Sequence, residues 1–444
     1  MVDVDCASWI ASLDKVGGLS IVIQGSLYDW NIVETANHCL HWRTLFPHAQ
    51  ILLSIAVTDV VTGDRDPRGV LTGLSLSPAR RPDGLLHSAL RQIENACDEV
   101  ILSVGALPLP PIKFDNKTNN INLMIVAAQA GLARATGAYT LRVRNDLFFQ
   151  DREFLTFYHE NVDRPRAGPN AVAQRVMISQ FFTLNPFTLE RLPFHFSDWF
   201  HFGLTADIRA MWDIGFMSLS DATYYLAHDH APGSNVYERR VRVRIAVEQH
   251  VAFSFLRAKF PDIRLDYHND WTSRERSMRI LLDDFLVCDM VRCKVIIEKY
   301  DRAFSDPRID LQCISYTEWL RLTLMTRDTR FADVFSKQAR YAQVHLLIRE
   351  EPGLRWLKLT INAGKFLLGQ ARRLFDPVRR LMATAGLRAM DTPLPGDTRN
   401  ERTPRPSRAH TRRLAPKPPQ ATQATQATQV TPSGLKLRSS RGAP

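Results

Sequence analysis

Short apolar runs alternate with longer amphipathic runs along the first 146 residues, and this alternation constrains the fold more than any other feature. The apolar runs, typical of buried strands, are residues 19–27 (LSIVIQGSL), 49–57 (AQILLSIAV), 98–105 (DEVILSVG) and the run that begins at 138 (AYTLRVRND). The runs with helical periodicity are residues 31–47, 85–97 and 118–137. Strands that alternate with helices predict a mainly parallel sheet with helices on both faces, a Rossmann-like α/β fold.

The run 118–137 gives the strongest helix signal in the chain. Asn119 or Asn120 can cap its start, because a short polar side chain satisfies a free backbone N–H there. Gly137 stands where a helix commonly ends in a left-handed residue. We therefore expect a helix that ends at a left-handed Gly137.

Polar residues cluster where two of the predicted strands end. They are Gln24, Gly25 and Ser26 after the first strand, and Arg144, Asn145 and Asp146 after the fourth. Ligands of open parallel sheets bind at the carboxyl ends of the strands, so we expect a ligand site here. Alternation also puts Arg142, Arg144 and Asp146 on one face of the fourth strand. The alternative is a solvated edge strand with an internal Arg–Asp pair.

Two common nucleotide-binding motifs are missing from the sequence. The segment after the first strand, QGSLYDW, has one glycine instead of the glycine fingerprint of a dinucleotide site. The chain also lacks the GxxxxGK[ST] pattern of a P-loop. These absences leave a nucleotide-sugar site of the glycosyltransferase type as the favoured interpretation.

Three segments resemble the WavE-type lipopolysaccharide-synthesis family. They are residues 19–27, residues 118–147 (TNNINLMIVAAQAGLARATGAYTLRVRNDL) and residues 193–204 (PFHFSDWFHFGL). A fainter likeness continues through VEQHVAFSFL and DDFLVCDMVRCKVII, so the resemblance covers about residues 19–325. It implies a GT-A type glycosyltransferase that assembles the outer-core oligosaccharide of bacterial lipopolysaccharide. It also places Arg144 and Asp146 at the family's Arg-x-Asp, and Asp198 and Trp199 at its Ser-Asp-Trp.

The resemblance and the strand-end argument together suggest roles for individual residues. The expected donor-binding residues are Gln24, Gly25, Ser26, Asn120, Asn122, Arg144, Asn145 and Asp146. The expected catalytic residues are Asp198 and Glu248, and the expected acceptor-binding residues are His195 and Trp199. A leaving diphosphate is stabilised either by a divalent cation on carboxylate oxygens or by arginine donors. The cation would be Mg²⁺ or Mn²⁺, held by Asp146.

The aromatic segment 191–203 has a second interpretation. Phe194, Phe196 and Phe200 suit a hydrophobic core, and Ser197 or Asp198 suits a helix cap. A glutamate in a first helical turn, as expected for Glu248, is favoured by the helix dipole without any catalytic role. The sequence leaves both interpretations open.

The C-terminal region carries the positive charge of the chain. Residues 354–444 contain 18 Lys and Arg against 4 Asp and Glu, whereas residues 1–353 contain 39 against 42. Residues 354–390 have the pattern of a basic amphipathic helix that lies on an anionic membrane surface, the alternative being a helix docked on the globular part. Residues 391–444, with their ATQ repeat, are predicted to be disordered. Because the basic residues lie outside the globular part, nucleic acid is not an expected partner.

The sequence therefore predicts five parts. They are an N-terminal extension (1–18), a GT-A-like domain (19–270), a helical C-terminal part of the catalytic unit (271–353), the basic helix (354–390) and the tail (391–444). No signal peptide or membrane span is evident, so we expect a cytoplasmic protein, peripheral on the inner membrane.

The expected activity is transfer of a sugar from a nucleotide-sugar donor to a lipid-linked oligosaccharide acceptor. The alternatives are a sugar-phosphate transferase of capsule synthesis and a non-catalytic scaffold that binds membrane or polyanion. The scaffold alternative predicts that residues 144 and 146 lie apart from any pocket.

Overall fold

The computed structural model describes residues 5–28, 30–56, 61–62, 75–76, 84–113, 118–297, 307–325 and 328–350. All of them belong to one compact unit, residues 1–369. The predicted basic helix at 354–390 and the predicted tail at 391–444 lie outside the described residues. Within the described ranges, no helix combines the length and apolar character needed to cross a membrane.

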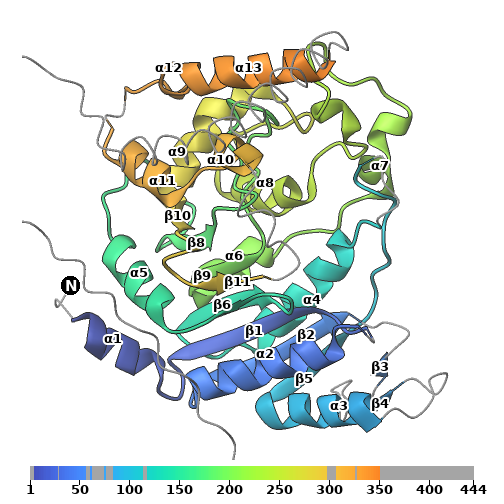
Figure 1. Ribbon diagram of the computed structural model, residues 1–444, viewed down its shortest axis with the longest axis vertical. Helices are drawn as coiled ribbons and strands as arrows, with labels where there is room; N and C mark the ends of the chain where they lie inside the picture. The colour runs from blue at the N-terminus through green and yellow to red at the C-terminus, as the bar shows by residue number, and fades with distance from the viewer. Residues whose placement is uncertain are drawn as a thin grey trace, which may run out of the picture. The chain divides into compact units, whose positions relative to one another are not determined.

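A seven-stranded sheet forms the centre of this part of the chain (Figure 1). The strands are β1 (Leu19–Ser26), β2 (Gln50–Ala56), β5 (Glu99–Ser103), β6 (Tyr139–Arg144), β8 (Val176–Ser179), β9 (Phe200–Leu204) and β10 (Phe285–Cys288). Their order is β5-β2-β1-β6-β9-β8-β10, and every neighbouring pair is parallel except the two that β9 makes. The predicted α/β fold with a mainly parallel sheet is confirmed, and the sheet is consistent with a GT-A-like fold.

Helices cover both faces of the sheet, as predicted. The first six helices are α1 (Cys6–Leu13), α2 (Ile32–Leu45), α3 (Gly84–Ala96), α4 (Ile121–Arg134), α5 (Glu153–Asn161) and α6 (Thr205–Trp212). The others are α7 (Leu219–Ala222), α8 (Val247–Lys259), α9 (Arg274–Asp284), α10 (Pro307–Gln312), α11 (Tyr316–Thr323), α12 (Phe331–Val334) and α13 (Ser336–Glu350). Short elements complete the set: β3 (Val61–Thr62), β4 (Ser75–Leu76), β7 (Phe148–Phe149), β11 (Val295–Ile296), and the 3₁₀ turns η1 (Tyr224–Leu226), η2 (Glu238–Arg240) and η3 (Trp271–Ser273).

Strand β1 shows how alternation separates the two faces. Gln24 points toward α4, where its Nε2 donates to the carbonyl oxygen of Met124 at 2.7 Å. Gly25 faces the other way, toward Asn145, whose Nδ2 donates to Oγ1 of Thr35 on α2 at 3.1 Å. Helices α4 and α2 therefore cover opposite faces of β1.

The start and the end of α4 differ in how well they were predicted. Oδ1 of Asn119 accepts a hydrogen bond from the backbone N–H of Ile121 at 3.1 Å, so an asparagine does satisfy a donor of the first turn. The predicted helix end at a left-handed Gly137 is wrong. Helix α4 ends at Arg134, Ala135 is extended, and Gly137 does not have a positive φ. A side chain at Gly137 would lie 2.5 Å from the backbone nitrogen of Ser20, so this glycine serves close packing.

The sheet also draws on the part of the chain predicted to be helical. Strand β10 lies within 271–353 and pairs in parallel with β8. The described residues around it form mostly helices, and α9 and α11 pack against β10. The sheet therefore continues beyond the boundary predicted at residue 270, because β10 is one of its strands.

Candidate functional site

A cavity of about 550 Å³ lies beside the carboxyl end of β6. The strand order reverses between β1 and β6, which is the kind of position where open α/β sheets bind ligands. Its walls come from the start of α4, the end of β6, the segment between β8 and β9, and the chain from η2 into α8. The predicted site residues that line it are Asn120, Arg144, His195, Asp198, Trp199 and Glu248.

An acidic pair faces this cavity. Asp198 precedes β9 and is 4% exposed, and Glu248 stands in the first turn of α8, as predicted. Burial raises the pKa of Asp198 to about 6, and the negative charge of Glu248 adds to the rise, while Arg142, Arg144 and His195 oppose it. A carboxyl group with a pKa near neutrality can exchange a proton in its working range.

His195 connects the acidic pair to the cavity wall. Its Nδ1 lies 2.8 Å from the carbonyl oxygen of Phe182, and its Nε2 lies 3.3 Å from Oε2 of Glu248. A carbonyl can only accept, so Nδ1 carries a hydrogen, and Nε2 donates to the Glu248 carboxylate when the imidazole is protonated. His195 therefore contacts Glu248 as well as lining the cavity.

Phe182 holds its carbonyl toward His195 in a strained backbone conformation. Its φ is 63°, in the left-handed region, where a non-glycine residue costs about 1 kcal/mol. Its ring also covers Trp199, with the ring centroids 5.3 Å apart. Trp199 is consequently only 2% exposed, so it forms the cavity wall and does not offer an open face for stacking.

Arg144 brings a positive charge to the same cavity. Its Nε and Nη2 donate to the two carboxylate oxygens of Asp146 at 2.8 and 2.6 Å. Its guanidinium lies 5.9 Å from the ring centroid of Trp199. Asp146 is not among the lining residues, so its contribution is to fix the direction of Arg144.

The donor set around Asp146 is poor for a metal ion. The described residues contain no cluster of three or more His, Cys, Asp or Glu side chains that could hold one. The protein groups shown here therefore do not make up a metal site. A cation at Asp146 would therefore take its remaining ligands from a bound diphosphate and water.

The start of α4 forms part of the cavity wall. Residues 118–121, with Asn120 among them, line the wall, and the helix is 14 residues long. The N-terminus of a helix binds anions through its free backbone N–H groups and the helix dipole. Asn122 is buried instead, and holds the backbone of Met217 through hydrogen bonds of 2.8 and 3.0 Å.

The residues predicted at the end of β1 support the site from below. Oε1 of Gln24 accepts from Nε of Arg142 at 2.5 Å, so both ends of this amide are used within the protein. Gly25 leaves room for Asn145, because a Cβ there would lie 2.1 Å from Oδ1 of that side chain. The carbonyl oxygen of Ser26 accepts from Nδ2 of Asn145 at 3.2 Å. Gln24, Gly25, Ser26 and Asn145 do not line the cavity.

The position of Arg142 corrects the interpretation of β6. This strand lies between β1 and β9, so the solvated-edge alternative is wrong. The Arg–Asp pair of that alternative does occur, between Arg144 and Asp146. Arg142, however, is completely buried and does not line the cavity.

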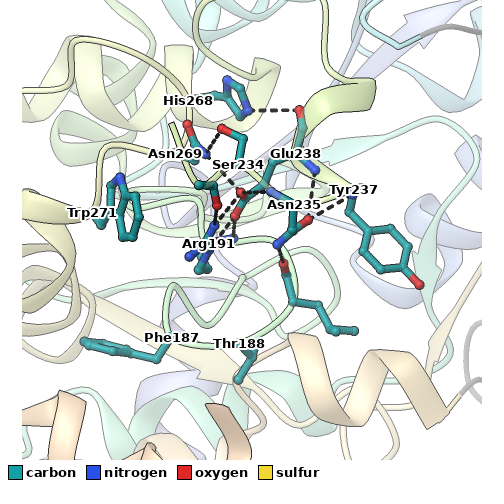
Figure 2. Close-up of polar contacts among 12 residues, drawn as sticks. Phe187, Thr188, Arg191, Ser234, Asn235, Tyr237, Glu238, His268, Asn269 and Trp271 are labelled. Atoms are coloured by element: carbon teal, nitrogen blue, oxygen red, sulfur yellow. Dashed lines mark hydrogen bonds and ion pairs between the residues drawn. The ribbon is translucent and has the colours of Figure 1, made fainter. Parts of the chain in front are cut away.

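An ion pair that the sequence did not reveal, between Arg191 and the buried Glu238, connects two walls of the cavity (Figure 2). Glu238 is fully buried and accepts hydrogen bonds from Nε and Nη2 of Arg191, both at 2.7 Å. The backbone N–H of Asn235 and Nδ2 of Asn269 also donate to Glu238, at 2.9 and 3.0 Å. Neighbours of this pair line the cavity: Leu189, Glu190 and Leu192 on one side, Tyr237, Arg240 and Val241 on the other.

The same cluster sets the charge of Glu238. Burial by itself would raise the pKa of this carboxyl, but the hydrogen bonds and charge of Arg191 outweigh burial and hold the pKa below its usual value. The guanidinium of Arg191 also lies 4.7 Å from the ring centroid of Trp271. Its partner is 47 positions away in the sequence, with no local pattern to signal the pairing.

Comparison with known proteins identifies the family of the chain. An α/β fold with a cavity at the strand ends is consistent with a GT-A-like fold. The family model described as WavE lipopolysaccharide synthesis matches residues 112–339, which is more than half of the chain. The chain therefore belongs to the WavE lipopolysaccharide synthesis family. All the cavity-lining residues lie within the matched range. No curated protein matched the sequence.

Replacing Glu238 by glutamine should destabilise the protein. The change removes a fully buried carboxylate and leaves the half-buried guanidinium of Arg191 without its counter-charge, so we expect a loss of about 3 kcal/mol at pH 7 in urea unfolding. A depressed carboxyl pKa stabilises the fold above the unfolded pKa, and this stability is lost as the pH falls through the folded value. The difference in unfolding free energy between wild type and Glu238→Gln should therefore shrink at low pH.

Asp262→Asn is the control, because Asp262 is 72% exposed and its pair with Arg276 spans 4.0 Å. Equal stability of both variants would contradict the bridging role.

Proposed function

We propose that this protein is a glycosyltransferase that moves a sugar from a nucleotide-sugar donor to a lipid-linked oligosaccharide, in lipopolysaccharide core or surface-polysaccharide synthesis. One observation supports the proposal most: a single cavity at the strand ends is lined by two carboxylates, the buried Asp198 and the half-buried Glu248, and by the cation Arg144. The family described above is one of lipopolysaccharide synthesis. Sugar transfer needs both features, a base for the acceptor and positive groups for the departing diphosphate.

The donor diphosphate fits the positive side of the cavity. Arg144 offers charged N–H donors, and residues 118–121 offer the N-terminus of α4. Arginine and helix N-termini are both recurrent phosphate binders. The bidentate contact with Asp146 keeps Arg144 in one orientation, which favours a preorganised site.

Asp198 is the proposed base toward the acceptor. As the acceptor oxygen forms its bond to the anomeric carbon, its proton passes to the carboxylate of Asp198. The bond between that carbon and the diphosphate oxygen breaks, and the electron pair leaves with the nucleoside diphosphate. Arg144 faces the negative charge that grows on this leaving group. Glu248, held by His195, keeps the proton affinity of Asp198 high through its negative charge.

A divalent cation remains a separate proposal. Asp146 is the carboxylate that would receive Mg²⁺ or Mn²⁺ brought with the donor, and such an ion would neutralise diphosphate charge. No step above depends on it. Dialysis against EDTA, followed by addition of each ion, tests it: a loss of activity that either ion restores would support the cation.

A panel of nucleotide sugars tests the proposed function. The wild type should bind one donor class and release nucleoside diphosphate, whereas a sugar-phosphate transferase would release nucleoside monophosphate. Arg144→Gln should weaken nucleoside diphosphate binding about 10- to 100-fold in calorimetry, since a charged hydrogen bond is worth about 1.5–3 kcal/mol. Arg292→Gln is the control, because Arg292 pairs with Glu160 and does not line the cavity. A wild type that binds no nucleotide sugar would refute the proposal and favour the scaffold.

The pH dependence tests Asp198. With a pKa of about 6, its carboxylate is available above that value, so kcat/KM should rise with pH through a limb near 6. Asp198→Asn should lower kcat about 10²- to 10⁴-fold, the usual contribution of a general base. A raised carboxyl pKa destabilises the fold as the pH rises from about 4 to 6, so the variant should be more stable at pH 8, by up to about 3 kcal/mol. An active variant, or one less stable than wild type at pH 8, would contradict this role. Asp213→Asn, an exposed change, is the control.

Truncation tests the proposed peripheral attachment to the inner membrane. Residues 354–390 contain 8 basic residues and 1 acidic residue, and each basic residue near an anionic leaflet contributes about 1 kcal/mol. A chain that ends at Glu351 should no longer sediment with anionic vesicles, and should lose activity on a lipid-linked acceptor while it still hydrolyses donor. Removal of 391–444 alone should have a much smaller effect. Precipitation of the shorter chain would instead indicate that residues 354–390 cover the globular part.

A further inference from the structure

Arg142 is a buried cation beneath the acidic pair. It is completely inaccessible to solvent, and its Nε donates to Oε1 of Gln24 at 2.5 Å. Its Nη1 donates to the backbone carbonyl oxygen of Asp198. Its guanidinium lies 4.3 Å from the ring centroid of Trp212 on α6. Within the described part of the chain, Nη2 has no hydrogen-bond partner.

Such a cation is an expensive choice for a sheet interior. Burial lowers the pKa of Arg142 to about 9, and the nearby negative charge of Asp198 counters part of this effect. The group therefore stays charged at neutral pH. Among the described residues, its hydrogen-bond acceptors are the amide oxygen of Gln24 and the backbone oxygen of Asp198, so no hydrogen-bonded carboxylate cancels its charge. A neutral side chain would avoid the desolvation cost if packing were the only requirement.

Its contacts instead connect two walls of the cavity. Gln24 bridges from Arg142 to the carbonyl oxygen of Met124 on α4, at 2.7 Å. Arg142 continues this chain of hydrogen bonds to the backbone at Asp198. Met124 and Asp198 both line the cavity. One chain of hydrogen bonds thus runs from α4 through β1 and β6 to the proposed base.

We propose that Arg142 is a positioning residue for the proposed transfer reaction: it fixes the backbone at Asp198 and stabilises the carboxylate form of that side chain from beneath the cavity. The inference rests on the proposed function, since it concerns the residue assigned there as the base. Arg142 itself touches no substrate.

The charges around Asp198 determine what the loss of Arg142 should do. Glu248, from α8, raises the pKa of Asp198, whereas Arg142 and Arg144, from β6, and His195, from the same segment as Asp198, lower it. Without the charge of Arg142, the repulsion from Glu248 is less opposed. Asp198 would then become a carboxylate only at higher pH.

The experiment compares the pH profiles of kcat/KM for full-length wild type, Arg142→Gln and Arg142→Lys. For Arg142→Gln we expect the acid limb to move up by about one pH unit from its position near 6, so that kcat/KM rises about fourfold between pH 6.5 and pH 8.5. Arg142→Lys keeps the charge but loses the two-pronged contact. It should keep the acid limb close to that of wild type and lower kcat at every pH.

A second variant covers the case in which Arg142→Gln does not fold. Gln24→Glu keeps the shape of residue 24 and places a carboxylate beside Nε of Arg142. This negative charge offsets the charge of Arg142, so the acid limb should move in the same direction. Arg175→Gln is the matched control. Arg175 is also completely buried, binds backbone carbonyls and lies 5.5 Å from the ring centroid of Trp319, but it does not line the cavity. It should lower stability and leave the acid limb in place.

Each outcome has a distinct meaning. A folded Arg142→Gln whose acid limb matches wild type would overturn the positioning role, and so would an unmoved limb in Gln24→Glu if the first variant does not fold. A shift of the limb in Arg175→Gln would also overturn it, because the effect would then be general. If the wild type transfers no sugar from any donor, the proposed function fails and takes this inference with it. An active wild type with unmoved limbs rejects this inference alone.

Discussion

The parallel pairing of β1 with β6 is the constraint on which the rest of the site depends. Its register places Gln24 opposite Arg144, and beyond it the backbone N–H of Asn145 donates to the carbonyl oxygen of Gln24 at 2.8 Å. The two strands are far apart in the sequence, and the chain reaches β6 only after β2 and β5 have been added on the other side of β1. The reversal leaves the space beside their carboxyl ends in which the cavity forms. Gly25 contributes by its lack of a side chain, since Asn145 occupies that volume.

The site combines charges of both signs in a small volume with little solvent. Asp198 is held among two arginines, a histidine and a second carboxylate, and its pKa reflects the balance between them. Such a balance is sensitive, because each interaction is strong where water is scarce. The positive wall near Arg144 and α4 and the acidic pair lie in the same cavity, so ligand binding and proton transfer can be coupled by charge alone.

The sequence predicted correctly those strands and helix positions that depend on the local pattern of apolar and polar residues. The apolar runs at 19–27 and 49–57 became β1 and β2, and the end of β6 was correctly expected beside a ligand-sized space. Glu248 was correctly placed in a first helical turn.

The features that could not be predicted are contacts between residues far apart in the sequence. Arg142 seemed ligand-facing from its alternation with Arg144, but Trp212, 70 positions later, covers it. Asn122 is taken by the backbone of Met217, and Arg191 by Glu238, in pairings that no periodicity encodes. The left-handed backbone of Phe182 is equally invisible, since phenylalanine gives no sign of positive φ.

That backbone conformation has a practical consequence for anyone who evolves this enzyme in the laboratory. Glycine or asparagine would relieve the strain at position 182, so a selection for heat resistance should enrich them there. Both residues tolerate a positive φ, so the carbonyl at position 182 would still accept from His195, but the ring that packs on Trp199 would be lost. Screens of this chain that score only heat resistance would then reward exposure of the indole that forms the cavity wall.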